Sequence, residues 1–220
     1  MTAPRYLDIA TWSRRDAFAF FRTFDKPYFN VCTRLDVAPL KRFIADAGGG
    51  GLALAYHFIA LRLANRIEPF RYRLEGGQVR VQPQVGGSTT VLREDGSFGF
   101  ADFDDGPSFA RFAAQASAAI EATRSGRAPF EPKPEDSARI HFTTLPWIHF
   151  TSFSHARNWG REDSIPKLAF GRIEVDGERA WMPLSVEVHH ALMDGLHVGQ
   201  FVQAFEAALA DPVAWLGTAQ

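Results

Sequence analysis

The sequence is poor in cysteine and carries no excess of either charge. Cys32 is the only cysteine among the 220 residues, which excludes an intramolecular disulfide framework and any metal site built from several cysteines. Such a chain suits a reducing compartment, and we expect a cytoplasmic protein. The 24 Lys and Arg residues balance the 25 Asp and Glu residues, so no broad positive field attracts nucleic acid or an anionic membrane. We expect neither as a partner.

Long apolar runs and two familiar enzyme signatures are also missing. No stretch approaches the ~20 apolar residues that span a bilayer, and the N-terminus lacks a long apolar run. The glycine tract at 48–51 runs into Leu52-Ala53-Leu54 instead of the Gly-Lys-Ser/Thr that ends a Walker loop, so it is interpreted as a flexible connection. The Gly-x-Ser-x-Gly pattern of a hydrolase nucleophile elbow does not occur.

Periodic segments predict helices packed on a large sheet. With 46% hydrophobic residues, the chain can bury a substantial core, and we expect one domain. Apolar spacing predicts helices over residues 14–24, 38–47, 52–67, 107–124 and 195–209. Alternation predicts strands over residues 28–37, 140–153 and 168–190, the last folded back at Asp176-Gly177.

Between these segments, residues 70–103 have the turn signals of a meander of short antiparallel strands. Breaks are predicted at Gly76-Gly77, Gly86-Gly87 and Asp95-Gly96. Strands without strict βα alternation favour an α/β (α+β) fold of two layers over a doubly wound one. We therefore expect a two-layer sandwich in which a large mixed, mostly antiparallel sheet packs against helices.

The chemistry of the sequence concentrates in residues 189–195, His-His-Ala-Leu-Met-Asp-Gly. Alternation places Val188 and His190 on one face of a strand and Glu187 and His189 on the other. Burial on the apolar face favours the neutral imidazole of His190, which is the form that accepts a proton. The same spacing also fits a hydrogen-bonded core histidine followed by Asp194 as the N-cap of the next helix.

A metal site is the weaker interpretation of this segment. His189, His190, Asp194 and His197 carry ligand groups, but adjacent histidines on a strand diverge and no cysteine adds to the set. Cys32 lies in a predicted strand and is interpreted as a small core residue, not a nucleophile. We expect no metal and no permanently bound cofactor.

The string from His189 to Gly195 resembles the His-His-x-x-x-Asp-Gly signature of chloramphenicol acetyltransferases. Peptide-synthetase condensation domains and dihydrolipoyl acyltransferase cores share it more loosely. Further segments look like blocks of the same family in the same order, at residues 12–18, 65–71, 145–147 and 150–153. The resemblance covers nearly the whole chain and implies a single domain over residues 1–220 with the fold of CoA-dependent acyltransferases.

By this resemblance, His190 is the general base that deprotonates an acceptor hydroxyl, so that the alkoxide attacks acetyl-CoA in a ternary complex. Thr143 stands where the family has a serine hydroxyl for the tetrahedral oxyanion. Asp194 would be buried and paired with Arg14, which fixes the loop that carries the base. Without the resemblance, Thr143 is as easily explained by its strand propensity and Arg14 as a solvated helix residue.

The resemblance also implies the binding partners. Acetyl-CoA is the co-substrate, and Arg172 falls where the family has a basic residue near the 3′-phosphate of CoA; the second basic contact would fall near Gly51 and is missing. The family forms a homotrimer with active sites at subunit interfaces. Chloramphenicol is the leading acceptor. The alternatives are an acyltransferase with a different, more polar acceptor and a catalytically silent trimeric binding protein.

The expected acceptor pocket departs from the family pattern. Phe29 keeps an aromatic side chain used against the antibiotic, whereas Phe21 stands where the family has a tyrosine hydroxyl, and Ala169 replaces a threonine. His155 and Arg157 stand where the family has apolar residues. Because such groups need hydrogen-bond partners in an apolar pocket, they favour a more polar or anionic acceptor.

Overall fold

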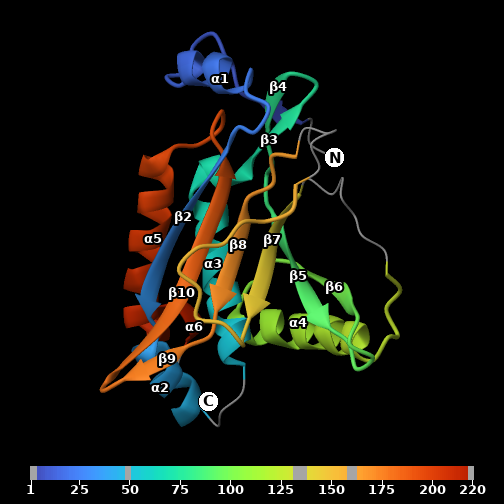
Figure 1. The fold of residues 1–220 in the computed structure, drawn as a ribbon, viewed down its shortest axis with the longest axis vertical. Coiled ribbons are helices and arrows are strands. Elements are labelled where there is room, and N and C mark those ends of the chain that lie inside the picture. The colour runs from blue at the N-terminus through green and yellow to red at the C-terminus, as the bar shows by residue number, and fades with distance from the viewer. Residues whose placement is uncertain (1–3, 48–50, 131–137, 158–162, 218–220) are drawn as a thin grey trace.

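The structure is a computed structural model that describes residues 4–47, 51–130, 138–157 and 163–217. Figure 1 shows helices along one side of a twisted sheet. The main sheet has seven strands in the order β2-β10-β8-β7-β5-β6, with β9 paired to β10. Its strands are β2 (Tyr28–Asp36), β5 (Gly86–Leu92), β6 (Phe98–Phe103), β7 (Arg139–Leu145), β8 (Lys167–Gly171), β9 (Glu174–Asp176) and β10 (Arg179–His189).

A second, small sheet and the helices complete the fold. The small sheet has the order β1-β4-β3 and consists of β1 (Arg5–Tyr6), β3 (Tyr72–Glu75) and β4 (Gln78–Val81). The helices are α1 (Arg15–Phe21), α2 (Ala38–Asp46), α3 (Leu52–Arg66), α4 (Phe109–Arg124), α5 (Gly195–Ala210) and α6 (Pro212–Leu216), with a 3₁₀ turn, η1, at Glu68–Arg71. None of the helices in the described ranges is long and apolar enough to cross a membrane.

The core lies between the main sheet and the helix layer. Helix α3 is buried along most of its length because apolar residues occur all around it. On β10, Leu184, Val186 and Val188 are fully buried in the core cluster. The alternate residues Ser185 and Glu187 are also buried, which means that the opposite face of the sheet is covered as well. The predicted two-layer architecture with a mixed sheet is confirmed.

Residues 70–103 do not form the predicted meander. The hairpin of β3 and β4 pairs with β1 in the small sheet, whereas the hairpin of β5 and β6 joins the main sheet through β7. The pairing of β5 with β7 is parallel and connects segments about 50 residues apart in sequence. The turn signals predicted both hairpins, but local sequence carries no information on which distant strand each one joins.

The predicted break at Gly86-Gly87 is wrong, because both glycines lie inside β5. A Cβ atom on Gly87 would lie 2.2 Å from the ring of Phe103 and 2.7 Å from that of Phe142. The two rings therefore require a residue without a side chain here.

The strand predicted over 140–153 is also too long. It ends at Leu145, and residues 146–157 continue without regular secondary structure, crossing in front of β8 and β10 in Figure 1.

Candidate active site

His190 lies in the turn between β10 and α5, directly after the last strand residue. Its imidazole is half-buried between two aromatic rings. Phe21 stacks on it with centroids 3.8 Å apart and an interplanar angle of 9°, and Phe29 lies at 4.6 Å and 48°. The structure thus brings His190 together, within one chain, with two residues that the sequence predicted for the acceptor pocket.

A backbone contact selects the tautomer of His190. Its Nδ1 atom lies 3.1 Å from the carbonyl oxygen of Met193. Because a carbonyl oxygen only accepts hydrogen bonds, Nδ1 must carry the proton and donate it. In the neutral imidazole, the lone pair is then on Nε2, which is the arrangement of a base ready to accept a proton from a neighbouring group.

Arg14 holds the turn that carries His190. Its Nε donates to Asp194 Oδ2, its Nη1 to the carbonyl of Ala191 and its Nη2 to the carbonyl of His190, each at 3.1 Å. The side chain of Arg14 is 12% exposed, so it is not a solvated helix residue. One guanidinium thus makes three directional bonds to the turn and fixes its shape.

Asp194 fulfils both of the roles that the sequence left open. It is the N-cap of α5, where its Oδ1 accepts from the backbone N–H of Leu196 at 3.0 Å. It is also the ion-pair partner of Arg14, but its side chain is 38% exposed, so the prediction that it is buried is wrong. Burial alone would raise the pKa of Asp194, but His197, Arg14 and the N–H of Leu196 favour the carboxylate, and the net shift of its pKa is downward.

Thr143 lies beside a large cavity where two parallel strands separate. Strand β5 pairs with β7 only over Gly86–Thr89 against Arg139–Phe142. Beyond this point, a cavity of about 1050 Å³ opens; we call it the wedge cavity. Its lining comes from α3, α4, β5, β7 and the turn after β7, including Leu54, His57, Val91, Arg93, Ile120, Arg124, Thr143, Thr144, Leu145 and Trp147. A gap between the carboxyl ends of parallel strands is a common ligand site.

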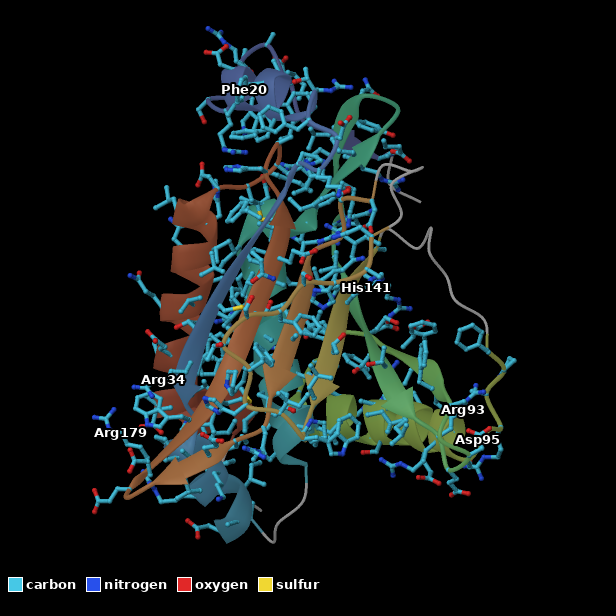
Figure 2. The ribbon with its side chains drawn as sticks, in the orientation of Figure 1. Phe20, Arg34, Arg93, Asp95, His141 and Arg179 are labelled. Carbon is cyan, nitrogen blue, oxygen red and sulfur yellow. The ribbon has the colours of Figure 1, made fainter. Side chains whose placement is uncertain are left out.

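His190 and Thr143 lie at different ends of the sheet within one chain. Thr143 is in register with Ala169 on β8, which is in register with Ser185 on β10. His190 follows Ser185 by five residues in the chain, about 17 Å along the strand, and two strand spacings add about 10 Å across, which gives ~19 Å between the two Cα atoms. In Figure 2, Phe20 on α1 and Arg93 beside the wedge cavity mark these opposite ends.

Comparison with known proteins identifies the family. Residues 4–206 match the family model of chloramphenicol acetyltransferase. The chain belongs to the chloramphenicol acetyltransferase family. A chloramphenicol acetyltransferase of Streptomyces acrimycini is 31% identical over 219 residues, which cover 97% of each chain. Chloramphenicol acetyltransferase 2 of Escherichia coli is 26% identical over 91% of this chain and 94% of its own.

Solved structures agree with this assignment. A chloramphenicol acetyltransferase superposes with a TM-score of 0.80 at 25% identity, covering 94% of this chain and 100% of its own. A dihydrolipoamide acetyltransferase of Azotobacter vinelandii shares the fold, with a TM-score of 0.67 at 20% identity over 97% of this chain and 92% of its own. The predicted family and fold are confirmed, and the chain is an acetyltransferase of the CoA-dependent acyltransferase fold.

In this chloramphenicol acetyltransferase family member, Arg157 is held by the chain's own groups. Its Nε donates to Glu187 Oε1 at 2.7 Å, its Nη1 to Asp163 Oδ1 at 3.2 Å, and its guanidinium stacks on Tyr28 at 4.3 Å. The side chain is 2% exposed. Burial would raise the pKa of Glu187, but hydrogen bonds from His155 and Arg157 outweigh it and lower the pKa to about 2. Arg157 therefore does not need partners from a ligand, contrary to our reasoning from the sequence.

His155 differs from Arg157 in this respect. Its backbone N–H donates to Glu187 Oε2 at 3.1 Å. Both ring nitrogens are buried and have no hydrogen-bond partner among the described residues. The distance of 3.8 Å from Nδ1 to Glu187 Oε2 is too long for a hydrogen bond.

Arg172 is exposed at the end of β8, next to the turn that borders the wedge cavity. Its Nη2 pairs with Glu174 Oε1 at 2.7 Å, and its Nη1 donates to the carbonyl of Trp147 at 3.3 Å. Arg172, the residue predicted to contact a phosphate of CoA, therefore lies beside the wedge cavity and is paired with Glu174.

Two further polar residues of the cavity wall were missed from the sequence. His57 lies in the buried helix α3, and Thr144 follows Thr143 on β7. The signal in the sequence was a single histidine within the apolar run of residues 52–61, because burying an imidazole without a hydrogen-bond partner costs folding free energy.

Proposed function

We propose that the chain transfers the acetyl group of acetyl-CoA to a hydroxyl of a small molecule, with chloramphenicol as the leading candidate and His190 as the general base. The observation that carries the proposal is the contact of His190 Nδ1 with the carbonyl of Met193. It leaves Nε2 as the proton acceptor, while Arg14 holds the turn rigidly.

The transfer is proposed to be direct. Nε2 of His190 takes the hydroxyl proton as the oxygen attacks the thioester carbonyl, and the hydroxyl of Thr143 stabilises the tetrahedral oxyanion. The C–S bond then breaks, and the imidazolium returns its proton to the departing thiolate of CoA. A positioned base of this kind contributes ~10²–10⁴ in rate, and one oxyanion donor is worth about 2.7–4 kcal/mol.

A complete site is proposed to need two copies of the chain, as in the trimer of this family. The ~19 Å between His190 and Thr143 in one chain is too long for a shared reaction centre. Exposed apolar side chains lie both on the His190 side and on the Thr143 side of the molecule. Phe20 on α1 is 59% exposed, and Trp147 beside the cavity is 60% exposed. Surfaces of this kind favour contact with another chain.

The wedge cavity is the proposed site of acetyl-CoA. Its volume of about 1050 Å³ suits a long, flexible ligand arm. Thr143 lies in its wall, and Arg172 is near its mouth, where a phosphate of CoA would replace Glu174 as the partner of the guanidinium. No permanent cofactor is needed for this chemistry.

A different, more polar acceptor is the second candidate, and His155 favours it. Its buried ring nitrogens have no hydrogen-bond partner among the described residues, and a hydroxyl or carbonyl group of an acceptor that displaces the side chains covering the ring would pair with them. A His155→Leu variant separates the two candidates, because it should weaken binding of a polar acceptor and improve binding of an apolar one.

The test follows thiol release from acetyl-CoA with chloramphenicol and with a panel of polar alcohols, for wild type and His190→Gln. We expect release with at least one acceptor and a loss of at least about a hundredfold in kcat for the variant. Unchanged kcat in His190→Gln would refute the mechanism, and no release with any acceptor would favour a silent binding protein. Activity with other alcohols alone would refute only the assignment of chloramphenicol.

Mixing two inactive variants tests the shared site. Subunits of His190→Gln and Thr143→Val are unfolded and refolded together, and each is also refolded alone. If the site is shared, mixed assemblies contain some interfaces with both wild-type residues and regain activity. No gain over the separately refolded variants would refute the sharing.

A further inference from the structure

Two arginines, Arg93 and Arg124, are the cationic side chains among the described residues that line the wedge cavity. Arg93 follows β5, and Arg124 is the last residue of α4. The backbone N–H of Glu94 donates to the carbonyl oxygen of Arg124 at 3.4 Å, so the tip of the β5–β6 hairpin touches the C-terminal end of α4. Figure 2 shows Arg93 at this tip, beside the helix. Both arginines therefore belong to one end of the cavity.

The register of the strands gives the position of this end relative to Thr143. Strands β5 and β7 are parallel, and their register places Thr90 level with Thr143. Glu94 lies four residues beyond Thr90, so its contact with Arg124 is about 10–13 Å farther along the direction of β5. Thr143 and Arg124 line the same cavity. The cavity therefore extends from the proposed oxyanion donor toward Arg124.

The pantetheine arm of CoA has a length that matches this separation. About 13 bonds join the thioester sulfur to the first phosphorus atom of the diphosphate, and an extended chain advances about 1.2 Å per bond, which gives about 15 Å. A thioester held at Thr143 therefore places the diphosphate near the level of Arg124, and the long side chain of this arginine adds further reach.

Arg93 is already held by the chain, whereas Arg124 is available to a ligand. Nη2 of Arg93 donates to the carbonyl of Ala128 at 2.9 Å, and its Nε is buried. The side chain of Arg124 is 53% exposed, and among the described residues it pairs with Glu121, one turn earlier on α4, at 3.3 Å. Exposed ion pairs of this kind contribute little to stability. A phosphate can therefore replace Glu121 and make charge-assisted hydrogen bonds to the guanidinium.

Acidic side chains in the same wall act against an anion. Glu94 and Glu121 line the cavity together with the two arginines, so this wall has no excess positive charge. Glu121 competes with a phosphate for Arg124 and also repels it. Removing the charge of Glu121 should therefore strengthen the binding of an anionic ligand, and removing the charge of Arg124 should weaken it.

We propose that Arg124 binds the diphosphate of acetyl-CoA. The inference rests on the proposed function, namely on acetyl-CoA as the substrate that occupies the wedge cavity. Gly51, which lines the same cavity, has no side chain that could bind a phosphate, and Arg124 supplies a cation on another wall. Arg172 then remains for the 3′-phosphate.

Three thioesters and four variants test this assignment through kcat/KM. Acetyl-CoA carries the diphosphate and the 3′-phosphate, acetyl-3′-dephospho-CoA carries the diphosphate alone, and acetyl-pantetheine carries neither. The variants are Arg124→Ala, Arg124→Lys, Glu121→Gln and, as a matched control, Arg111→Ala. Arg111 is an exposed arginine of the same helix that does not line the cavity.

The loss in Arg124→Ala should follow the diphosphate. We expect kcat/KM to fall about five- to tenfold for acetyl-CoA and for acetyl-3′-dephospho-CoA, and to stay within about twofold for acetyl-pantetheine. Arg124→Lys should lose less, because it retains the charge without the planar fork. Glu121→Gln should raise kcat/KM about twofold for the two thioesters that carry the diphosphate. Arg111→Ala should match wild type with all three.

The outcomes separate this inference from the proposed function. Thiol release from acetyl-CoA by wild type tests the proposed function, and its absence would remove both. If wild type is active and Arg124→Ala keeps its kcat/KM for acetyl-CoA, the assignment of Arg124 is wrong. A loss with acetyl-CoA but not with acetyl-3′-dephospho-CoA would assign Arg124 to the 3′-phosphate instead. An equal loss with acetyl-pantetheine would show a structural role and overturn the inference.

Discussion

Lowering the pH from about 7.5 to about 5 should remove about 2 kcal/mol of folding stability that depends on His57 alone. The imidazole is enclosed by the sheet and α3, and burial lowers its pKa from 6.5 to about 3. The unfolded chain keeps an ordinary histidine with a pKa of about 6.5. Below this pH the unfolded state binds one more proton than the folded state.

The sign and size of the effect follow from this difference in bound protons. The stability that depends on neutral His57 is fully present above about pH 6.5 and is lost as the pH falls toward about 3. Each pH unit inside this window costs about 1.4 kcal/mol. From about pH 7.5 to about pH 5 the loss is about 2 kcal/mol. His189, with its pKa lowered to about 4 chiefly by burial, should add a similar loss in this range.

Urea unfolding at constant protein concentration measures this effect, for wild type, His57→Leu and His57→Gln at several pH values. Both variants lack the titrating group, so each should lose about 2 kcal/mol less than wild type between about pH 7.5 and 5. Comparing how the unfolding free energy changes with pH, instead of its absolute value, removes any pH-independent packing penalty of either substitution. Parallel pH dependences in all three proteins would refute the conclusion that His57 is held neutral by burial.

Arg14→Ala should lower kcat for thiol release at least about tenfold and destabilise by about 2–3 kcal/mol, because Asp194 and the turn carbonyls lose their shared partner; Arg15→Ala, which removes an exposed guanidinium, should change neither. Glu187→Gln should destabilise by about 3 kcal/mol at neutral pH, and the difference should shrink below about pH 4.5, as the pKa near 2 requires. Gly87→Ala should cost about 1–3 kcal/mol in urea unfolding through its contact with two phenyl rings.

The sequence was most informative where local pattern determines structure. Period and turn residues predicted α3, α5 and the β10 strand within a few residues, because burial on one face repeats at the spacing of the element. The motif at His190 predicted the turn and its arginine partner through a family resemblance. Asp194 illustrates the limit of spacing alone, which indicated only a helix cap. The ion pair with Arg14 came from the family resemblance, and the residue makes both interactions.

Features that depend on distant pairing could not be predicted in the same way. Arg157 was expected to seek a ligand, since its sequence neighbours do not reveal that Glu187, thirty residues later, lies beside it. Gly87 was interpreted as a turn residue because the rings that exclude a side chain there come from β6 and β7. The contact of His57 with Thr144 likewise joins a helix and a strand 87 residues apart.

The distance between His190 and Thr143 has a consequence for how the protein behaves on dilution. If each reaction centre takes its base from one chain and its oxyanion donor from another, a folded single chain is inert. Specific activity should then fall at concentrations where the subunits separate, while the circular dichroism of the chain persists to lower concentration. Folding and catalysis would therefore have separate concentration thresholds, and a mutation at the contact between chains could abolish activity without unfolding either one.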